Sequence, residues 1–354
     1  MSQQFKFMKF SANIQAGFGS LKNIGNELKE MGIRGHIIII AGETSFAVAG
    51  KIIVDSLSEN GYQIDTLIEN HIEPTVYFVE NLKARVRNLL IGDDSLLLGI
   101  GGGSTLDVCK YISYKLDLNF IAVPTLLSSD AIATGYSVLW DNNKNNAIPT
   151  KPPFLIIGDY EILSKQPKKY VAAGVGDMLS KLSGLYDWRL SFWLGNETYN
   201  DFAMNVAKST TELLEARMED VAKMNYIGME TLFLAEVTDG YLMQLSGTTR
   251  VAAGSEHLFT FALEQVHGKS NHGAYCGLGT IMMSYLQNRG EKIVRNHLIT
   301  VGAPTCAAEV DVKPDEIVKA LTMAHKMRNW YTILGTNGLS EGSAERLARY
   351  SQVI

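Results

Sequence analysis

A buried strand that runs directly into three glycines is the feature that most restricts the folds open to this chain. The apolar run 96–100 is followed by Gly101-Gly102-Gly103, and a helical pattern begins a few residues later. Consecutive glycines let a backbone approach a pyrophosphate closely, and a helix amino terminus supplies N–H groups. The alternative is a tight turn that needs positive φ. We predict a phosphate-binding turn at the end of a parallel strand, although the spacing is neither Gly-x-Gly-x-x-Gly nor a Walker loop.

The first 160 residues alternate between short apolar runs and helical patterns, which indicates a parallel sheet covered on both faces. Expected strands are 36–41, 62–67, 95–100, 120–123 and 154–158, and expected helices are 46–58, 75–92 and 106–116. The polar segment 140–149 is expected to be a hairpin tip or a surface loop.

Beyond about residue 164 the pattern becomes helical throughout, with Gly and Pro as stops. The expected helices are 170–190, 200–222, 226–245, 255–266, 276–288 and 314–327. We therefore predict an α/β dinucleotide-binding domain over 1–160 and an all-α metal- and substrate-binding domain over 161–354.

Composition argues against several functional classes. The net charge is −5, and the sequence has no basic stripe of the kind that binds nucleic acid or a membrane surface. Cys109, Cys276 and Cys306 have no paired spacing, which is typical of a reducing cytoplasm. The start, Met1–Phe7, lacks the apolar core of a signal peptide. Cys276 itself is interpreted as a small buried hydrophobe.

A second loop leaves the carboxyl end of the strand at 120–123. It offers hydroxyls from Thr125, Ser128 and Thr134 to a nucleotide, and Asp130 to substrate hydroxyls. Ligands of open parallel sheets gather at that edge. The alternative is that these side chains only cap a helix.

Two histidines in an apolar helical setting, His257 and His272, suggest a metal site, and Asp177 is the candidate third ligand. Two His and one Asp leave one position open, as a catalytic metal requires. Each residue also has an ordinary interpretation, because a core histidine can bond a carbonyl and Asp177 can cap a helix. His267 is a rival to His272.

These motifs occur in an order that resembles iron-containing alcohol dehydrogenases, glycerol dehydrogenase and dehydroquinate synthase, and most resembles the sn-glycerol-1-phosphate dehydrogenase branch. The similarity spans roughly residues 37–334 and rests on five motifs: Gly101-Gly102-Gly103-x-x-x-Asp107, Pro124-Thr125-x-x-Ser128-x-Asp130, Gly174-Val175-Gly176-Asp177, Gly254-Ser255-Glu256-His257 and His272-Gly273.

The resemblance implies a Rossmann-like domain followed by a helical metal-binding domain, with NAD or NADP in the cleft between them. It implies one divalent metal at Asp177, His257 and His272, with zinc as the first choice and iron or nickel as alternatives. Asp130 and Asp177 would face the substrate. The nucleotide would be contacted by Gly101, Gly102, Gly103, Ser104, Thr105, Asp107, Thr125, Ser128 and Thr134.

The substrate is expected to be a small polyol or polyol phosphate. Glycerol 1-phosphate and dihydroxyacetone phosphate are the lead pair, and glycerol with dihydroxyacetone is the alternative. Phe261 stands where the branch has a His near the substrate, and a phosphate needs cationic or N–H partners. A dehydroquinate-synthase-like lyase or cyclase is the alternative of another class. Glu43 can bond an adenosine ribose and so favour NAD. We also expect a homo-oligomer.

Overall fold

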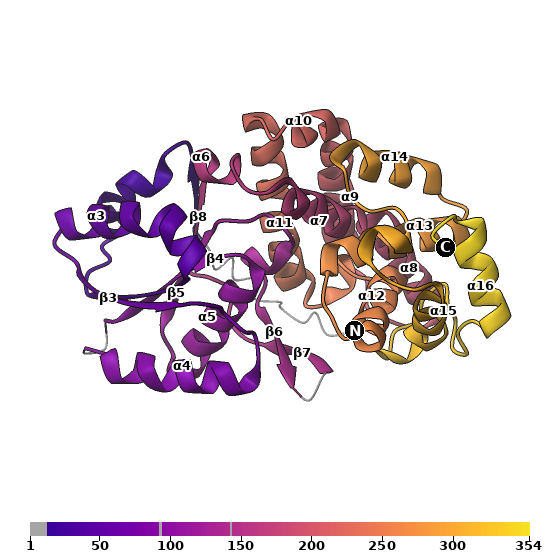
Figure 1. The fold of residues 1–354 in the computed structure, drawn as a ribbon, viewed down its shortest axis with the longest axis horizontal. Helices are drawn as coiled ribbons and strands as arrows, with labels where there is room; N and C mark the ends of the chain where they lie inside the picture. Colours follow the sequence, from indigo (N-terminus) through magenta and orange to yellow (C-terminus); the bar gives the residue numbers. More distant parts are fainter. Residues whose placement is uncertain (1–12, 92–93, 142–143) are drawn as a thin grey trace, which may run out of the picture.

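The computed structural model describes residues 13–91, 94–141 and 144–354, which form a sheet-containing half and a helical half (Figure 1). The start of the chain, Met1–Phe7, lies outside these residues. The described strands are β1 (Asn13–Gly17), β2 (His36–Gly42), β3 (Gln63–Glu69), β4 (Leu96–Gly101), β5 (Asn119–Pro124), β6 (Tyr136–Asp141), β7 (Lys144–Pro149) and β8 (Leu155–Asp159).

In the described part of the chain, six strands form one parallel sheet in the order β1-β8-β5-β4-β2-β3. The chain moves from β2 outward to β3 and from β4 in the opposite direction to β5. The carboxyl ends of β2 and β4 therefore flank a topological switch point, where ligands of such sheets bind.

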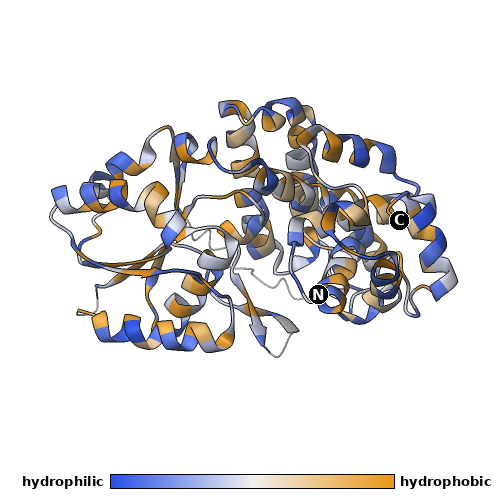
Figure 2. Cartoon of the chain, in the orientation of Figure 1, coloured by the Kyte–Doolittle hydropathy of each residue, from blue (hydrophilic) through white to orange (hydrophobic). Residues whose placement is uncertain are grey.

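Alternate residues of the central strands pack on opposite faces of the sheet, because side chains alternate along a strand. Ile37 and Ile39 belong to the core under α1 (Ile24–Glu30) and α3 (Lys51–Glu59). Ile38 and Ile40 belong to the core under α4 (Val76–Leu89) and α5 (Gly103–Leu116). Figure 2 shows these apolar strands between helices whose outer faces are hydrophilic. Burial on both faces explains the continuous apolar runs in the sequence.

The other described helices follow in chain order. They are α2 (Glu43–Ser45), α6 (Tyr160–Leu163), α7 (Lys168–Leu179), α8 (Lys181–Leu194), α9 (Asp201–Ala216), α10 (Met218–Ala222), α11 (Tyr226–Ser246), α12 (Ser255–His267), α13 (His272–Leu286), α14 (Glu291–Val301), α15 (Pro314–Met323) and α16 (Glu341–Tyr350). Short 3-10 or π turns are η1 (Ser20–Asn23), η2 (Phe46–Gly50), η3 (Asp130–Ile132), η4 (Thr249–Val251), η5 (Ala307–Val310) and η6 (Ala324–Lys326). None of the helices in the described ranges is long and apolar enough to cross a membrane.

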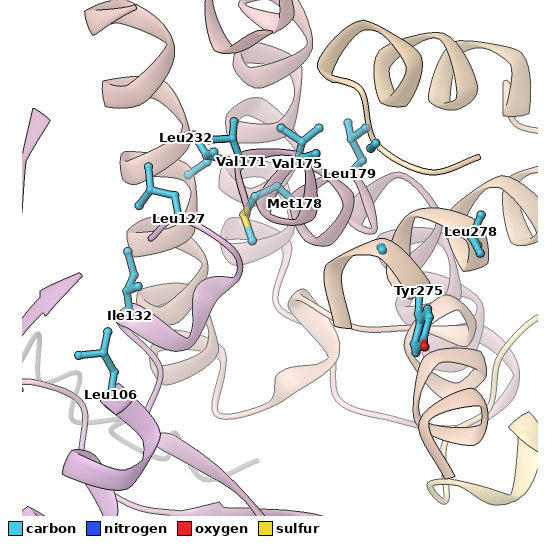
Figure 3. Packing of buried hydrophobic residues seen from close by; sticks show 14 of the residues in the cluster. Leu106, Leu127, Ile132, Val171, Val175, Met178, Leu179, Leu232, Tyr275 and Leu278 are labelled. Carbon is cyan, nitrogen blue, oxygen red and sulfur yellow. The ribbon is translucent and has the colours of Figure 1, made fainter. Parts of the chain in front are cut away.

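One apolar core continues from the sheet into the helical half (Figure 3). Leu106 of α5 and Leu127 belong to the same cluster as Val175 of α7, Leu232 of α11 and Leu278 of α13. Burial of an apolar side chain contributes about 1.5–3 kcal/mol, so this shared core fixes the two halves against each other. The site described below depends on that fixed relation.

The predicted fold class, a Rossmann-like α/β half followed by an all-α half, is confirmed. Of the predicted hairpin or loop segment 140–149, residues 140–141 belong to β6 and 144–149 to β7, and these two strands pair antiparallel. Several details differ, because β1, α14 and α16 were not expected and the predicted helix 170–190 is divided at Ser180. Helix α13 begins at His272 rather than at residue 276. The division at residue 160 stays a prediction.

Candidate active site between the sheet and the helical half

A cavity of about 870 Å³ lies where the carboxyl ends of β2 and β4 meet the helical half. That volume is in the range of ligand sites. Its walls include the loop after β2, the start of α5, the loop after β5, the β6–β7 hairpin, and the ends of α12 and α13. It is therefore a single space bounded by both halves of the molecule.

The triple glycine shapes the sheet side of this cavity. None of the three glycines is among the described residues with positive φ, so the turn itself does not require glycine there. Close packing requires glycine at two of these positions. A Cβ on Gly101 would lie 2.5 Å from the Thr105 hydroxyl, and a Cβ on Gly102 would lie 2.9 Å from Leu126. No side chain of the described residues caps α5 at Gly102. Gly103, Ser104 and Thr105, which carry the first N–H groups of α5, line the cavity, and uncapped N–H groups at a helix start suit an anion.

A buried lysine joins the start of α5 to the loop after β5. Lys110 Nζ donates to the carbonyls of Ala131 (2.8 Å) and Tyr136 (2.6 Å) and to the Thr134 hydroxyl (3.1 Å). It also pairs with Asp107, whose other oxygen accepts from the Val138 N–H. Asp107 and Thr134 line the cavity, but these bonds engage them in holding the hairpin.

Helices α7 and α13 touch through glycines, and this contact builds the metal-ligating end. A Cβ on Gly176 would lie 2.2 Å from the Gly273 carbonyl oxygen, and a Cβ on Gly273 would lie 2.0 Å from that of Ala173. Only glycine permits such an approach of two backbones. The neighbours of these glycines, Asp177 and His272, are therefore brought to the same point.

At this point the donor atoms of Asp177, His257 and His272 converge. Asp177 Oδ1 lies 3.3 Å from His257 Nε2 and 4.0 Å from His272 Nε2. This oxygen is buried and has no hydrogen-bond partner among the described residues. Donors around a tetrahedral zinc ion, each about 2.1 Å from it, are about 3.4 Å apart. The spacing and the unsatisfied oxygen both fit a divalent metal.

Two carboxylates orient the histidines from behind. His257 Nδ1 lies 3.0 Å from Glu256 Oε1, and His272 Nδ1 lies 3.5 Å from Glu264 Oε1. Ser183 donates to Glu256, and Ser270 donates to Glu264. A carboxylate behind an imidazole directs the opposite nitrogen, here Nε2, toward a metal.

The electrostatics of the cluster favour positive charge. Burial alone would lower the pKa of His257 and His272, but acidic neighbours, Cys276 first, raise both well above the ordinary value. Burial would raise the pKa of Asp177, yet Lys181 and the two histidines hold it well below its usual range. Either protons on the imidazoles or a divalent cation can supply the positive charge.

A buried ionic cluster lies beneath Asp177. The Asp130 N–H donates to Asp177 Oδ2 at 3.2 Å, and Lys181 pairs with Asp239 at 2.6 Å. Burial, followed by the charges of Asp177 and Asp239, raises the pKa of Asp130 well above its ordinary value. Asp130 also lines the cavity, so its carboxyl lies between this cluster and the ligand space.

Most of the predicted site residues are brought together. The predicted residues on the cavity wall are Gly102, Gly103, Ser104, Thr105, Asp107, Ser128, Asp130, Thr134, His257 and His272. Gly101 and Thr125 are buried beneath the turn, where the Thr125 N–H donates to the Gly101 carbonyl. Asp177 is buried behind the two histidines, which it meets by Oδ1.

The rival histidine lies elsewhere. His267 Nδ1 is 3.1 Å from Glu316, and His267 is not in the described group of residues whose ligand atoms converge. That group contains Cys276 instead. Cys276 is buried, as its interpretation as a small buried hydrophobe expects, and its sulfur also lies near both histidines. Its position four residues after His272 was the available signal, because such residues share one helix face.

The sequence interpretation also missed an arginine. Arg328, just after η6, lines the cavity, and its Cζ lies 4.8 Å from the centroid of the Phe261 ring. Phe261 in turn stacks against His272, with ring centroids 6.2 Å apart. A cationic group thus stands beside the metal-ligating end. His71 and Glu43, which are exposed, also lie on the cavity wall.

A glycine turn at the start of a helix and a cluster of possible metal ligands lie on the wall of one cavity, and the comparisons with known proteins give the class to which such a chain belongs. The chain belongs to the iron-containing alcohol dehydrogenases, and a model of that family matches residues 15–167. Within this class it belongs with the glycerol-1-phosphate dehydrogenases. It is 34% identical to the Methanosarcina mazei enzyme named glycerol-1-phosphate dehydrogenase [NAD(P)+], over 99% of this chain and 97% of that one. The enzyme of that name from Saccharolobus solfataricus is also 34% identical, over 96% and 95%.

Solved structures share the fold. Glycerol dehydrogenase from Schizosaccharomyces pombe superposes with a TM-score of 0.77 at 20% identity, over 99% of this chain and 92% of that one. NADH-dependent butanol dehydrogenase A from Thermotoga maritima gives 0.74 at 17% identity, over 98% of each chain. At these identities the similarity establishes the architecture only.

Proposed function

We propose that this protein interconverts sn-glycerol 1-phosphate and dihydroxyacetone phosphate, with NAD or NADP and one divalent metal. The observation that carries the proposal is the cavity itself, which has the open start of α5 at one end and Asp177, His257 and His272 at the other. The names of the full-length relatives supply the substrate pair.

The residues have separate tasks in this proposal. The N–H groups at Gly103 to Thr105 bind the pyrophosphate, with Ser128 and Thr134 beside the nucleotide. Asp177, His257 and His272 hold the metal. When bound, the metal would polarise the substrate oxygen and NAD(P) would exchange the hydride. Phe261, Trp140 and Trp330 line the cavity and help to exclude water.

Asp130 is the proposed substrate-facing carboxyl. It lies on the cavity wall, and its backbone N–H is bonded to Asp177, so its position is tied to that of the metal ligands. There it can accept a hydrogen bond from a substrate hydroxyl and orient the carbon that exchanges hydride. Its link to Lys181 and Asp239 connects the substrate to a buried charged network.

Arg328 is the proposed partner of the substrate phosphate. A phosphate needs cationic or N–H partners, and Phe261 offers neither. Arg328 stacks on that ring and donates from Nη1 to the Met327 carbonyl at 2.9 Å, which together hold the guanidinium while its remaining N–H groups can bond a phosphate. The phosphorylated substrate is therefore compatible with Phe261, because the charge comes from another element of the fold.

The proposal is tested by reduction of dihydroxyacetone phosphate and of dihydroxyacetone, with NADH and with NADPH, by the metal-loaded protein. We expect stoichiometric oxidation of the nicotinamide and a preference for the phosphorylated ketone. Preference for dihydroxyacetone would favour a glycerol dehydrogenase. Turnover of a dehydroquinate-synthase substrate without net change in NADH would favour the lyase or cyclase.

A homo-oligomer in the cytoplasm remains our expectation. Phe192, Trp193 and Leu194, at the end of α8, and Phe202, in α9, are exposed apolar side chains of the kind found at subunit interfaces. The three cysteines are free, which agrees with a reducing compartment. Light scattering of the purified protein measures the oligomeric state directly.

A further inference from the structure

Cys276 lies on α13 one helical turn after His272, so both side chains project from the same face. Its side chain is fully buried. Sγ lies 3.6 Å from His257 Nε2 and 3.7 Å from His272 Nε2, the two nitrogens that the carboxylates behind them direct inward. The sulfur therefore meets both histidines on their metal-ligating sides.

The distances from the Cys276 sulfur to the two histidine nitrogens match those expected for a fourth ligand of the metal. One ligand atom each from Asp177, His257, His272 and Cys276 lies within 4.8 Å of every other. A tetrahedral site with metal–nitrogen bonds of about 2.1 Å and a metal–sulfur bond of about 2.3 Å has sulfur–nitrogen edges of about 3.6 Å. Both sulfur–nitrogen distances match that edge.

An independent observation indicates that the cluster receives a cation. Asp177 is 1% exposed, and its Oδ1 has no hydrogen-bond partner among the described residues. Oδ1 lies 3.3 Å from His257 Nε2, and without a proton on that nitrogen the buried carboxylate oxygen stays unpaired, which costs about 1–3 kcal/mol. The oxygen, both imidazoles and the sulfur all face one point, and a cation there would satisfy the oxygen.

We propose that Cys276 is a thiolate ligand of the metal, so that the donor set is Asp177, His257, His272 and Cys276. This inference rests on the metal site of the proposed function and adds a donor to it. Thiolate is a soft ligand, so the fourth donor favours zinc or cobalt over magnesium or manganese. Four protein donors fill a tetrahedral shell, so the substrate oxygen would enter as a fifth ligand, an expansion that catalytic zinc sites allow. The proposed contribution of Cys276 is to the retention and selection of the metal.

The alternative role of Cys276 is that of an uncharged core thiol. Thr260 Oγ1 lies 3.5 Å from Sγ and also donates to the Glu256 carbonyl at 2.9 Å, so its hydroxyl can accept from a thiol. In that case Cys276 stays protonated and three residues alone hold the metal. The two roles differ in whether a metal–sulfur bond forms.

Cobalt spectroscopy separates the two roles. The full-length protein is stripped of metal, loaded with one equivalent of Co²⁺, and its near-ultraviolet absorption is recorded. We expect a sulfur-to-cobalt charge-transfer band in the wild type. The band should be absent from C276S and retained in C306S, in which a half-buried cysteine just before η5, outside the described group of converging ligand atoms, is replaced. Cobalt bound to the wild type without that band would overturn the proposal.

A competition titration measures the consequence for affinity. The zinc dissociation constant, measured against a chromophoric chelator, should rise about tenfold or more in C276S and stay unchanged in C306S. Equal zinc affinities in C276S and wild type would contradict the role in retention. If C276S does not fold, X-ray absorption of the zinc-loaded wild type decides, because a sulfur shell at about 2.3 Å is required.

The test of Cys276 as a metal ligand is independent of the test of the proposed function. A wild-type protein that reduces dihydroxyacetone phosphate but shows no metal–sulfur bond would overturn only the role of Cys276. A protein with the bond but without activity on this substrate would overturn only the proposed function.

Discussion

The guanidinium of Arg328 lies over the ring of Phe261, with Cζ 4.8 Å from the ring centroid. Both residues line the cavity, as do His257 and His272, the proposed metal ligands. We expect R328L to lower kcat/KM for glycerol 1-phosphate about 10- to 100-fold, because a charge-assisted hydrogen bond contributes about 1.5–3 kcal/mol. Turnover of unphosphorylated glycerol should change little, which steady-state kinetics on both substrates measures.

Arg289 provides the matched control for this change. It stacks on Tyr186 at 5.2 Å in the same manner but is not among the described residues of the cavity wall. R289L should leave both substrates unaffected. An equal loss for both substrates in R328L would show that Arg328 supports the fold of the cavity rather than the phosphate.

The start of α5 can be tested by adding a side chain. Gly103 lines the cavity, and a Cβ there would already lie 3.3 Å from Ala131. G103V should raise the dissociation constant for NAD(P) about tenfold or more while leaving the metal content unchanged, because branched methyl groups would occupy the space of the pyrophosphate. A Cβ on Gly342 of α16 would meet only the end of the Arg346 side chain, at 3.7 Å, so G342V is the control. Unchanged nucleotide affinity in G103V would argue against this turn as the phosphate site.

Glu236 gives a pH-dependent prediction. It is fully buried, neither of its oxygens has a partner among the described residues, and burial followed by the charges of Asp177 and Asp130 raises its pKa well above the ordinary value. Below the ordinary carboxyl pKa the group is protonated in both folded and unfolded chains. As the pH rises further, only the unfolded chain releases the proton, so stability falls by up to about 1.4 kcal/mol per pH unit.

E236Q removes this ionisable group. Between about pH 5 and about pH 8, the free energy of unfolding of the wild type should therefore fall relative to that of E236Q. Chemical denaturation across this range measures the difference. E219Q, in which an exposed carboxylate is replaced, should follow the wild type. Parallel profiles for E236Q and the wild type would mean that Glu236 is ionised when buried.

Metal binding should stabilise the folded protein. A free zinc concentration 100 times the dissociation constant raises the free energy of unfolding by about 2.7 kcal/mol, because the ion binds the folded chain. Chelation should therefore lower the Tm of the wild type, and H272A should show little response to zinc. H267A should respond like the wild type, since His267 pairs with Glu316 instead. A metal response lost in H267A and kept in H272A would reverse the assignment.

The sheet was predictable because its strands are buried on both faces. No polar residue interrupts the run Ile37–Ile40 or the strand that ends at Gly101, and a glycine marks the end of each strand. Strand β1 was not predicted, because it lies at the edge of the sheet and its residues are mostly exposed. Helix α13 was predicted too short, because Gly273 weakens the helical pattern where close packing with α7 requires it.

The order of motifs predicted Asp177, His257 and His272, but not the residues that complete their surroundings. Cys276 was missed because the predicted helix began there, so its shared face with His272 was hidden. Arg328 was missed because it follows the last predicted helix and reaches the cavity only through tertiary packing. No local pattern in the sequence indicates that Arg328 lies at the cavity.

Oxidation of sn-glycerol 1-phosphate, compared with sn-glycerol 3-phosphate and glycerol, tests the central claim most directly. The zinc-loaded wild type is assayed for NADH and NADPH formation with each alcohol, before and after chelation. We predict the highest kcat/KM for sn-glycerol 1-phosphate, loss of turnover on chelation and recovery when zinc returns. A higher kcat/KM for glycerol, or turnover that survives complete removal of the metal, would contradict it.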